Sequence, residues 1–519
     1  MIRQLFLGTA LLLSSAGGLV IEIVAGRLIA PYVGMSLYTW TAIIAVVLAG
    51  LSAGHWIGGR LAGAQVTYAA ANMRLAVALG LASISSLLAL ALLRVLSGPL
   101  LSSGLSPVPV VILLTTALFL LPSLFVGIVA PILTKLALED KGDDPGPVIG
   151  RMYAIGTLGS IAGTLRAGSL FISWIGSIWT VIAVAVVYGA LALACLVMGR
   201  PSKGIAVGVG LLVLIGGTAL FGQNVGAFIT PCTVESDYFC IRVDDMTAET
   251  GRPSALMALD HLVHSINDRL EPGILYSPYI RFVDEYTDRR LIGARPDRPF
   301  QAFFIGGGGY SLPRAWASSR PSSRLVVAEI DPAVTQAAAE GMWLNTADKA
   351  LDIRHEDARQ LLQSLPKEAQ FDVVFGDAFR DISIPAHLVT QEFHAEIAAR
   401  LRPRGFYVVN VVDHGGEPAF LASLVETMKQ DFKSVEIWAE AEELAAAQQG
   451  AGQRVTYILV ASQQEAHMGR LGYRHGIARQ WRRWPLSALA QAVSETPVIL
   501  TDDYAPVDRL MTRLLLAPE

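Results

Sequence analysis

The distribution of apolar positions divides the chain into two halves of different character. Up to about residue 225 long apolar segments follow one another with very few acidic residues, whereas from about residue 230 apolar and polar positions mix as in a soluble protein. A helix that crosses a bilayer needs roughly 20 mainly apolar residues. The segments of that length are 5–30, 38–62, 75–98, 107–137, 149–173, 177–199 and 204–222. We therefore predict a transmembrane helical domain of about seven spans over residues 1–225.

Small residues recur inside these segments, for example in "GLSAGHWIGG" and "GTLGSIAGT". They allow helix backbones to approach closely in lipid, where the burial of apolar surface no longer drives association. The sequence thus favours a compact bundle over a set of independent anchors. The first segment is too long, and is followed by too many others, to be a cleaved signal peptide.

Several ionisable residues interrupt the apolar segments, and an ionisable group in hydrocarbon marks a candidate functional site. They are Glu22, Arg27, His55, Arg60, Lys135 and Arg166. Those near segment ends, such as Arg27, can extend to the interface. Glu22 lies deeper, and two interpretations stay open for it: a structural ion pair with an arginine of the bundle, or a role in transport or substrate access.

The orientation of the second half is also open. Most positive charge lies at the N-terminus and in the loops near residues 60–74, 135–151 and 200–203, which places the N-terminus in the cytoplasm. Seven spans would then leave the second half outside. Cys232 and Cys240 would suit an oxidising compartment if they form a bridge. The cysteines do not have the spacing of a metal site, so no metal is assigned.

The second half alternates strand-like and helix-like segments. Residues 230–290 contain two β-rich runs separated by the turn-prone "ETGRPS", which predicts a small β-rich segment. Over 291–519 the apolar runs "AFFIG", "RLVVAEI", "DIRHED", "FDVVFGD" and "GFYVVNVV" alternate with helical stretches. This alternation predicts a largely parallel sheet, and the closely spaced "SVEIWA" and "VTYILVA" predict an antiparallel strand at its end. The predicted fold class is an α-helical multi-span membrane bundle followed by an α/β Rossmann-like domain with a small N-terminal β segment.

The ends of the predicted parallel strands carry the candidate chemistry. Gly306 to Gly309 follow the first strand, where backbone without side chains can approach a ligand. The second, third and fourth strands end near Glu329, Asp357 and Asp377. Helix capping explains one such acid easily, but four ordered features indicate a nucleoside pocket. No lysine follows the glycines, which argues against a phosphate-binding P-loop.

At these residues the chain resembles the spermidine synthase family, the aminopropyltransferases. The resemblance extends over about 234–415, with "GGGGY", "AEIDP", "EDA" and "FGDAF" in the places of the family motifs. Upstream, "LMALDHLVHS" and "ILYSPY" are similar to the part that leads into the family's amine pocket. "GDAFRDISIPAHLVTQEF" and "LTDDYAPVD" are similar to signatures of bacterial membrane-fused members.

The resemblance implies an aminopropyltransferase with no permanently bound cofactor. Its co-substrate would be a sulfonium nucleoside, decarboxylated S-adenosylmethionine, and its acceptor a polyamine such as putrescine. In this interpretation Asp377 takes the proton of the amine and Tyr276 orients it. The resemblance assigns nucleoside binding to Gly306, Gly307, Gly308, Glu329, Asp357 and Ala358, and amine binding to Asp260 and His264. Asp381 is a further candidate for amine binding. It further implies a multi-pass protein of the bacterial inner membrane and a homodimer. Because the nucleoside co-substrate is cytoplasmic, the implied chemistry favours the cytoplasm for the second half, in conflict with the span count, the charge distribution and a Cys232–Cys240 bridge. The sequence has no basic block that would indicate a nucleic-acid partner.

Two positions depart from the family pattern. His264 stands where soluble members often carry glutamine. The family's GGGDG turn carries an aspartate that holds the aminopropyl amine, and Gly309 stands in its place, followed by Tyr310. Three functions therefore stay open. Asp381, Asp502 or Asp503 could replace the missing acid in aminopropyl transfer. The site could instead use S-adenosylmethionine itself, as a lyase or as a methyl- or aminocarboxypropyltransferase. The third is a transporter or sensor that binds a nucleoside or polyamine without catalysis.

Overall fold

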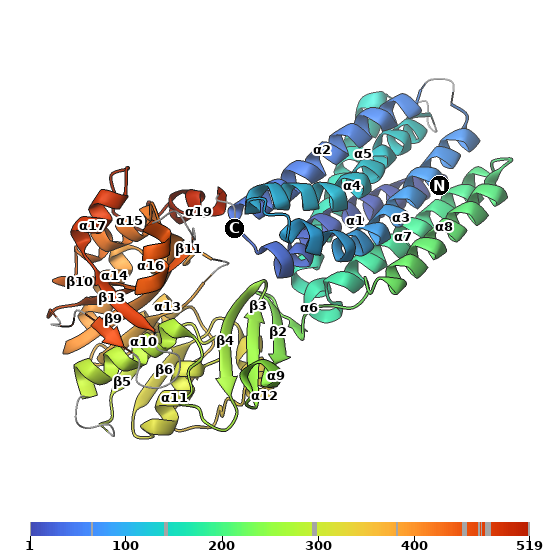
Figure 1. Ribbon diagram of the computed structural model, residues 1–519. Helices are drawn as coiled ribbons and strands as arrows, with labels where there is room; N and C mark the ends of the chain where they lie inside the picture. The colour runs from blue at the N-terminus through green and yellow to red at the C-terminus, as the bar shows by residue number, and fades with distance from the viewer. Residues whose placement is uncertain are drawn as a thin grey trace. The chain divides into compact units, whose positions relative to one another are not determined.

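The computed structural model describes residues 2–63, 66–139, 144–292, 298–379, 382–448, 454–465, 468, 470–472 and 479–516. The chain divides into two compact units, Met1–Cys240 and Ile241–Glu519. The first is helical, and the second contains most of the strands (Figure 1).

Long helices build the first unit because its sequence is continuously apolar. They are α1 (Ile2–Val33), α2 (Leu37–Leu61), α3 (Tyr68–Leu101), α4 (Pro107–Glu139), α5 (Pro145–Arg166), α7 (Ser177–Gly199) and α8 (Gly204–Asn224). A π-helical turn, η1 (Ala167–Phe171), and the short α6 (Ile172–Ile175) connect α5 to α7. In the described chain 6 of these helices are long and apolar enough to cross a membrane. Of the predicted segments only 149–173 falls short, because α5 carries Arg151, Arg166 and several glycines.

Glycines bring these helices into backbone contact. A Cβ at Gly54 of α2 would lie 2.8 Å from Cα of Gly127 in α4. In α5, a Cβ at Gly159 would lie 3.0 Å from Cα of Leu12 in α1, and a Cβ at Gly163 would lie 2.9 Å from Cα of Ala16 in α1. Because the residue numbers of these contact pairs increase together along both helices, α1 and α5 run parallel. The small residues therefore serve the close packing that the sequence predicts.

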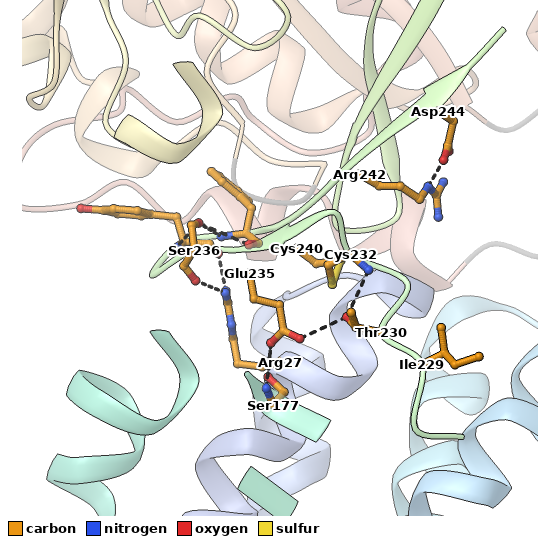
Figure 2. The surroundings of a disulfide bond; sticks show 12 residues. Arg27, Ser177, Ile229, Thr230, Cys232, Glu235, Ser236, Cys240, Arg242 and Asp244 are labelled. Carbon is orange, nitrogen blue, oxygen red and sulfur yellow. Dashed lines mark hydrogen bonds and ion pairs between the residues drawn. A yellow bond between two sulfur atoms is a disulfide. The ribbon is translucent and has the colours of Figure 1, made fainter. Parts of the chain in front are cut away.

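The segment that follows α8 folds back on the ends of α1 and α7 (Figure 2). Arg27 donates hydrogen bonds to the carbonyl oxygens of Ser236 and Tyr238. Glu235 accepts from the backbone nitrogen of Ser177 at 2.9 Å and from its hydroxyl at 2.7 Å. We call this end of the bundle the exit end.

A disulfide joins Cys232 and Cys240 at the exit end (Figure 2). We call the other end of the bundle the N-terminal end. There the C-terminal end of α4 contacts the segment after α2, because Lys135 donates to the carbonyl oxygen of Gly63 at 2.7 Å. Lys135 and Arg27 thus reach polar groups at the bundle ends, as their positions near the segment ends predict. Glu22 forms no ion pair with any described residue, so the predicted pairing with an arginine is not found.

A small antiparallel sheet follows the bundle, in the order β1-β2-β3-β4. Its strands are β1 (Val234–Glu235), β2 (Cys240–Asp245), β3 (Ser254–Leu259) and β4 (Leu262–Asp268), with the short α9 (Thr247–Thr250) between β2 and β3. These strands lie within the segment for which a β-rich structure is predicted.

A nine-stranded mixed sheet forms the core of the second unit, in the order β12-β13-β10-β11-β9-β8-β5-β6-β7. Its strands are β5 (Gln301–Ile305), β6 (Arg324–Ala328), β7 (Leu351–Arg354), β8 (Phe371–Gly376), β9 (Leu401–His414), β10 (Ser434–Glu440), β11 (Arg454–Ser462), β12 (Arg470–Gly472) and β13 (Gln480–Trp484). Strands β5 to β9 pair in parallel, and β9, β11, β10, β13 and β12 pair antiparallel. The structure confirms the predicted α/β fold and its antiparallel end.

Helices connect and cover this sheet. They are α10 (Pro278–Thr287), α11 (Ser311–Ser319), α12 (Pro332–Gly341), α13 (Ala358–Ser364), α14 (Gln391–Arg400), α15 (Ala419–Met428), α16 (Ala441–Gln448), α17 (Leu486–Ala492), α18 (Val507–Leu510) and α19 (Thr512–Leu516). The chain passes from β5 outward to β6 and β7 and then returns to β8 on the other side of β5. In open α/β sheets this reversal opens a crevice at the carboxyl ends of the two central strands, here β5 and β8.

Candidate active site

The glycine turn lies at the carboxyl end of β5, against the end of β8. Gly306 has a φ of 96°, and a Cβ at this position would lie 2.8 Å from the carbonyl oxygen of Asp377. The backbone nitrogen of Asp377 donates to the carbonyl oxygen of Ile305 at 3.0 Å, which fixes the two strand ends together. Only glycine fits at position 306, because the conformation and the neighbouring backbone both exclude a side chain.

The Asp377 carboxylate is held between two donors. The Tyr279 hydroxyl donates to its Oδ2 at 2.9 Å, and the Asn410 side-chain nitrogen donates to its Oδ1 at 3.0 Å. Burial raises the pKa of Asp377 to about 7, against the lowering effect of both hydrogen bonds. A carboxylate with this pKa can accept a proton from a substrate at neutral pH. The structure therefore places a group suited to general base catalysis at the switch point.

The tyrosine at Asp377 is Tyr279, which the sequence motifs did not single out. Tyr276 instead donates to Asp268 Oδ2 at 3.3 Å, on the carboxylate that also pairs with Arg252 at 2.6 Å. Tyr279 lies in the first turn of α10, three residues beyond Tyr276. The predicted orienting role of Tyr276 has no contact with Asp377 to support it.

Glu329 lies beneath the glycine turn. Its Oε2 accepts from the backbone nitrogens of Gly307 at 2.8 Å and Gly308 at 3.3 Å, and its Oε1 accepts from the backbone nitrogen of Asp331 at 3.0 Å. Burial raises its pKa. Glu329 therefore fixes the conformation of the turn, and the ribose contact implied by the resemblance stays a prediction.

Asp357 acts as the N-cap of α13. Its Oδ1 accepts from the backbone nitrogens of Arg359 and Gln360, both at 3.0 Å, and Ala358 is the first residue of the helix. Its Oδ2 lies 2.7 Å from Nε2 of His387. Capping thus accounts for one carboxylate oxygen, and the adenine contacts assigned to Asp357 and Ala358 stay a prediction.

The residues assigned to the amine pocket are dispersed. Asp260 is buried in the tight turn between β3 and β4, with a φ of 53°. His264 of β4 lies next to the glycine turn, because a Cβ at Gly308 would lie 3.8 Å from the Cβ of His264. Burial lowers the pKa of His264 to about 4, so the imidazole is neutral. Asp381 lies outside the described residues.

Asp502 makes an ion pair away from the glycine turn. Its two oxygens accept from Arg359 of α13 at 2.7 and 2.8 Å, and these hydrogen bonds lower its pKa. Both carboxylate oxygens of Asp502 are therefore bound to α13. The structure therefore gives no support for Asp502 as a replacement for the missing family aspartate.

Gly309 is enclosed by residues of β4 that the motifs also missed. Its backbone nitrogen donates to Ser265 Oγ at 2.9 Å, and its carbonyl oxygen accepts from the Asn267 side chain at 2.7 Å. A Cβ at Gly309 would lie 2.5 Å from Cβ of Ser265. The small sheet thus fills the space next to the turn, and an aspartate does not fit there without displacing β4.

Two curated relatives share sequence with the chain. It is 32% identical over 137 residues to the polyamine aminopropyltransferase of Vibrio vulnificus, which covers 26% of the chain and 44% of the relative. It is 27% identical over 240 residues to a probable polyamine aminopropyl transferase of Bifidobacterium longum, which covers 43% of the chain and 52% of the relative. The chain thus spans about half the length of these relatives. No protein-family model matches it.

Two solved structures are similar to part of the chain. A probable spermidine synthase from Corynebacterium glutamicum has a TM-score of 0.45 and 21% identity, over 54% of this chain and 98% of its own. The spermidine synthase of Thermotoga maritima has a TM-score of 0.29 and 18% identity, over 40% of this chain and 66% of its own. The two sequence relatives support the spermidine synthase-like family that the motifs indicate.

Proposed function

We propose that the chain is a membrane-bound aminopropyltransferase. It would transfer the aminopropyl group of decarboxylated S-adenosylmethionine to a polyamine such as putrescine. The observation that carries this proposal is the Asp377 carboxylate, held by Tyr279 and Asn410 at the switch point, with a pKa of about 7. The sequence relatives named as aminopropyltransferases support the same reaction.

In this reaction Asp377 removes one proton from the ammonium group of the acceptor. The freed nitrogen lone pair attacks the propyl carbon next to the sulfonium, so that a C–N bond forms as the C–S bond breaks. The bonding electrons return to sulfur, which leaves as neutral methylthioadenosine. The protein's contribution is to remove the proton and to orient the amine in line with the C–S bond.

A second candidate uses intact S-adenosylmethionine. It is favoured by Gly309, because the turn lacks the acid that holds the aminopropyl amine in the family, and Ser265 excludes a side chain there. Without that negative charge nothing at position 309 repels the carboxylate of S-adenosylmethionine. The reaction would be internal cleavage or transfer of a methyl or aminocarboxypropyl group.

Separate incubations distinguish these reactions. The purified full-length protein is given each sulfonium nucleoside alone, with and without putrescine, and methylthioadenosine is measured. We expect release only from the decarboxylated form together with putrescine. Release from S-adenosylmethionine without an amine would refute the proposal in favour of cleavage. Tight nucleoside binding without any product would favour a transporter or sensor.

We further propose that the second unit lies outside the cytoplasm. Because α1 and α5 run parallel, α5 traverses the bundle, and α8 ends at the exit end, opposite to the start of α1. The described basic residues near the N-terminal end are Arg3, Arg60, Arg74, Lys135, Arg151, Arg200 and Lys203, and those near the exit end are Arg27, Arg94 and Arg166. The positive-inside rule then assigns the N-terminal end to the cytoplasm. A disulfide at the exit end agrees with an oxidising compartment.

Reporter fusions in a bacterial inner membrane test this orientation. Alkaline phosphatase fused after Glu519 should be active, and a green fluorescent protein at the same place should stay dark. After Lys203, before α8, a phosphatase fusion should be inactive and a green fluorescent protein fusion should be fluorescent. A fluorescent C-terminal fusion with inactive phosphatase would place the second unit in the cytoplasm and refute this assignment.

A further inference from the structure

A cavity that opens at the surface of the first unit lies between α1, α2, α4 and α5, and the reaction described above does not use it. Its volume is about 340 Å³, within the range of sites that bind small organic molecules. Glycine and aliphatic side chains form part of its wall. The polar residues that line it are Ser14, Ser15, His55, Thr134, Tyr153, Thr157 and Ser160. His55 is the ionisable residue among them, and an ionisable group within an apolar bundle marks a candidate functional site.

The hydroxyls present acceptors to this cavity. Ser14 donates its proton to the carbonyl oxygen of Leu11 at 3.1 Å, Thr134 to Ala130 at 2.9 Å and Thr157 to Tyr153 at 3.0 Å. A hydroxyl has one proton to donate and lone pairs that can still accept. Because each proton is bound to a carbonyl of the same helix, the remaining lone pairs are available to a ligand that donates. At these three positions the wall therefore suits a ligand that donates N–H or O–H groups.

Two ionisable residues complete the site. His55 lines the cavity and forms no hydrogen bond or ion pair with a described residue, and the same is true of Glu22. Glu22 follows the lining residue Gly18 by four positions on α1, so both are on one face. Helical side chains lean toward the N-terminus of their helix, so Glu22 leans toward the turn of Gly18 and lies next to the cavity without lining it.

We propose that this cavity binds an organic cation with protonated amine groups, with Glu22 as its counter-ion and the hydroxyls and His55 as acceptors. Ionisable residues within transmembrane segments pair with an opposite charge or face a polar cavity, and Glu22 makes no ion pair with a described residue. The choice of an amine rests on the proposed function, whose substrates are cations of this class. The existence of the site does not depend on it.

Equilibrium binding of radiolabelled putrescine to the full-length protein in lipid nanodiscs tests the proposal. The Asp377→Asn variant removes the carboxylate of the α/β site, and we expect it to retain one bound putrescine per chain. Adding Glu22→Gln should weaken that binding at least tenfold, whereas Glu22→Asp, which keeps the charge, should retain most of it. Glu139→Gln is the matched control, because Glu139 pairs with Lys135 at 3.2 Å and does not line the cavity.

The outcomes separate this proposal from the proposed function. Tetramethylammonium, a cation without N–H donors, should not compete with putrescine if the acceptors recognise N–H groups. Unchanged binding in the Glu22→Gln variant, with an unchanged thermal unfolding midpoint, would overturn the site. Loss of all binding in Asp377→Asn would also overturn it and leave the proposed transferase intact. Binding that depends on Glu22 in a protein without transferase activity would uphold the site and refute the proposed function.

Discussion

Replacing Asp377 by Asn is expected to lower kcat/KM for aminopropyl transfer by about 10²–10⁴-fold, the usual contribution of a general base. The variant keeps the shape of the side chain and loses only its ability to take a proton. Its neighbours can adapt, because Oδ1 of Asn410 has no hydrogen-bond partner in the described structure and a rotated amide can offer this oxygen to the new side chain. Initial rates with decarboxylated S-adenosylmethionine and putrescine measure the effect.

Asp372→Asn is the matched control for this variant. Asp372 lies near the start of the same strand, β8, where it accepts from Arg402 and from the backbone nitrogen of Gln301. This end of the strand is opposite to the glycine turn, so the control should lose stability but keep kcat/KM. Equal losses of activity in both variants would show that Asp377 acts through folding alone.

The pH dependence follows from the same carboxylate. Its pKa rises from 3.8 to about 7 in the folded state, so the base is protonated and inactive below about pH 7. Wild-type kcat/KM should fall about tenfold for each pH unit below that point, and Asp377→Asn should lack this transition. The stability of the fold depends on pH in the opposite direction to kcat/KM. The folded state retains the proton up to about pH 7, so this group stabilises the fold at low pH and loses that effect as the pH rises through 7.

Replacing Gly306 by Ala is expected to give the second large effect. The new methyl group would lie 2.8 Å from the carbonyl oxygen of Asp377 at a φ of 96°. Strained backbone of this kind costs on the order of 1–3 kcal/mol. Relief of the clash must move the turn away from β8, and a displacement of about 1 Å can lower catalysis about 10²-fold. We therefore expect reduced stability together with a loss of activity, measured by chemical denaturation and by initial rates.

Gly251→Ala separates the two causes. Gly251 also has a positive φ, of 68°, but no atom lies within 4 Å of a Cβ at that position. This control should lose about 1–2 kcal/mol from backbone strain and keep full activity. If Gly306→Ala behaves in the same way as this control, the contact with the Asp377 backbone has no functional importance.

The sequence predicts the α/β sheet well because strand ends and hydrophobic period are local properties. The runs from "AFFIG" to "GFYVVNVV" become β5 to β9, and the acids at their ends lie where the parallel topology requires. This is why Asp377 could be assigned to the crevice before its surroundings were known. The order of the strands, with β5 beside β8, is set by the tertiary fold and not by any single residue.

Contacts between segments that are distant in the chain could not be predicted from the sequence. Tyr279 and Asn410 meet Asp377 across separations of 98 and 33 residues, and no local pattern distinguishes Tyr279 from Tyr276. The contacts of Glu329 with the glycine turn also depend on tertiary packing. A carboxylate at a strand end is predictable, whereas its hydrogen-bond partner is set by the fold.

The packing of α5 on α1 has a consequence for how the proposed membrane domain would be inserted. With Arg151 and Arg166, α5 is the least apolar of the long helices, and it rests on α1 through Gly159 and Gly163. Recognition by the insertion machinery depends on the apolar character of each segment, so α5 would need α1 already in place to be retained across the bilayer. Without that partner an even number of crossings would result, and everything synthesised after α8 would finish on the opposite side.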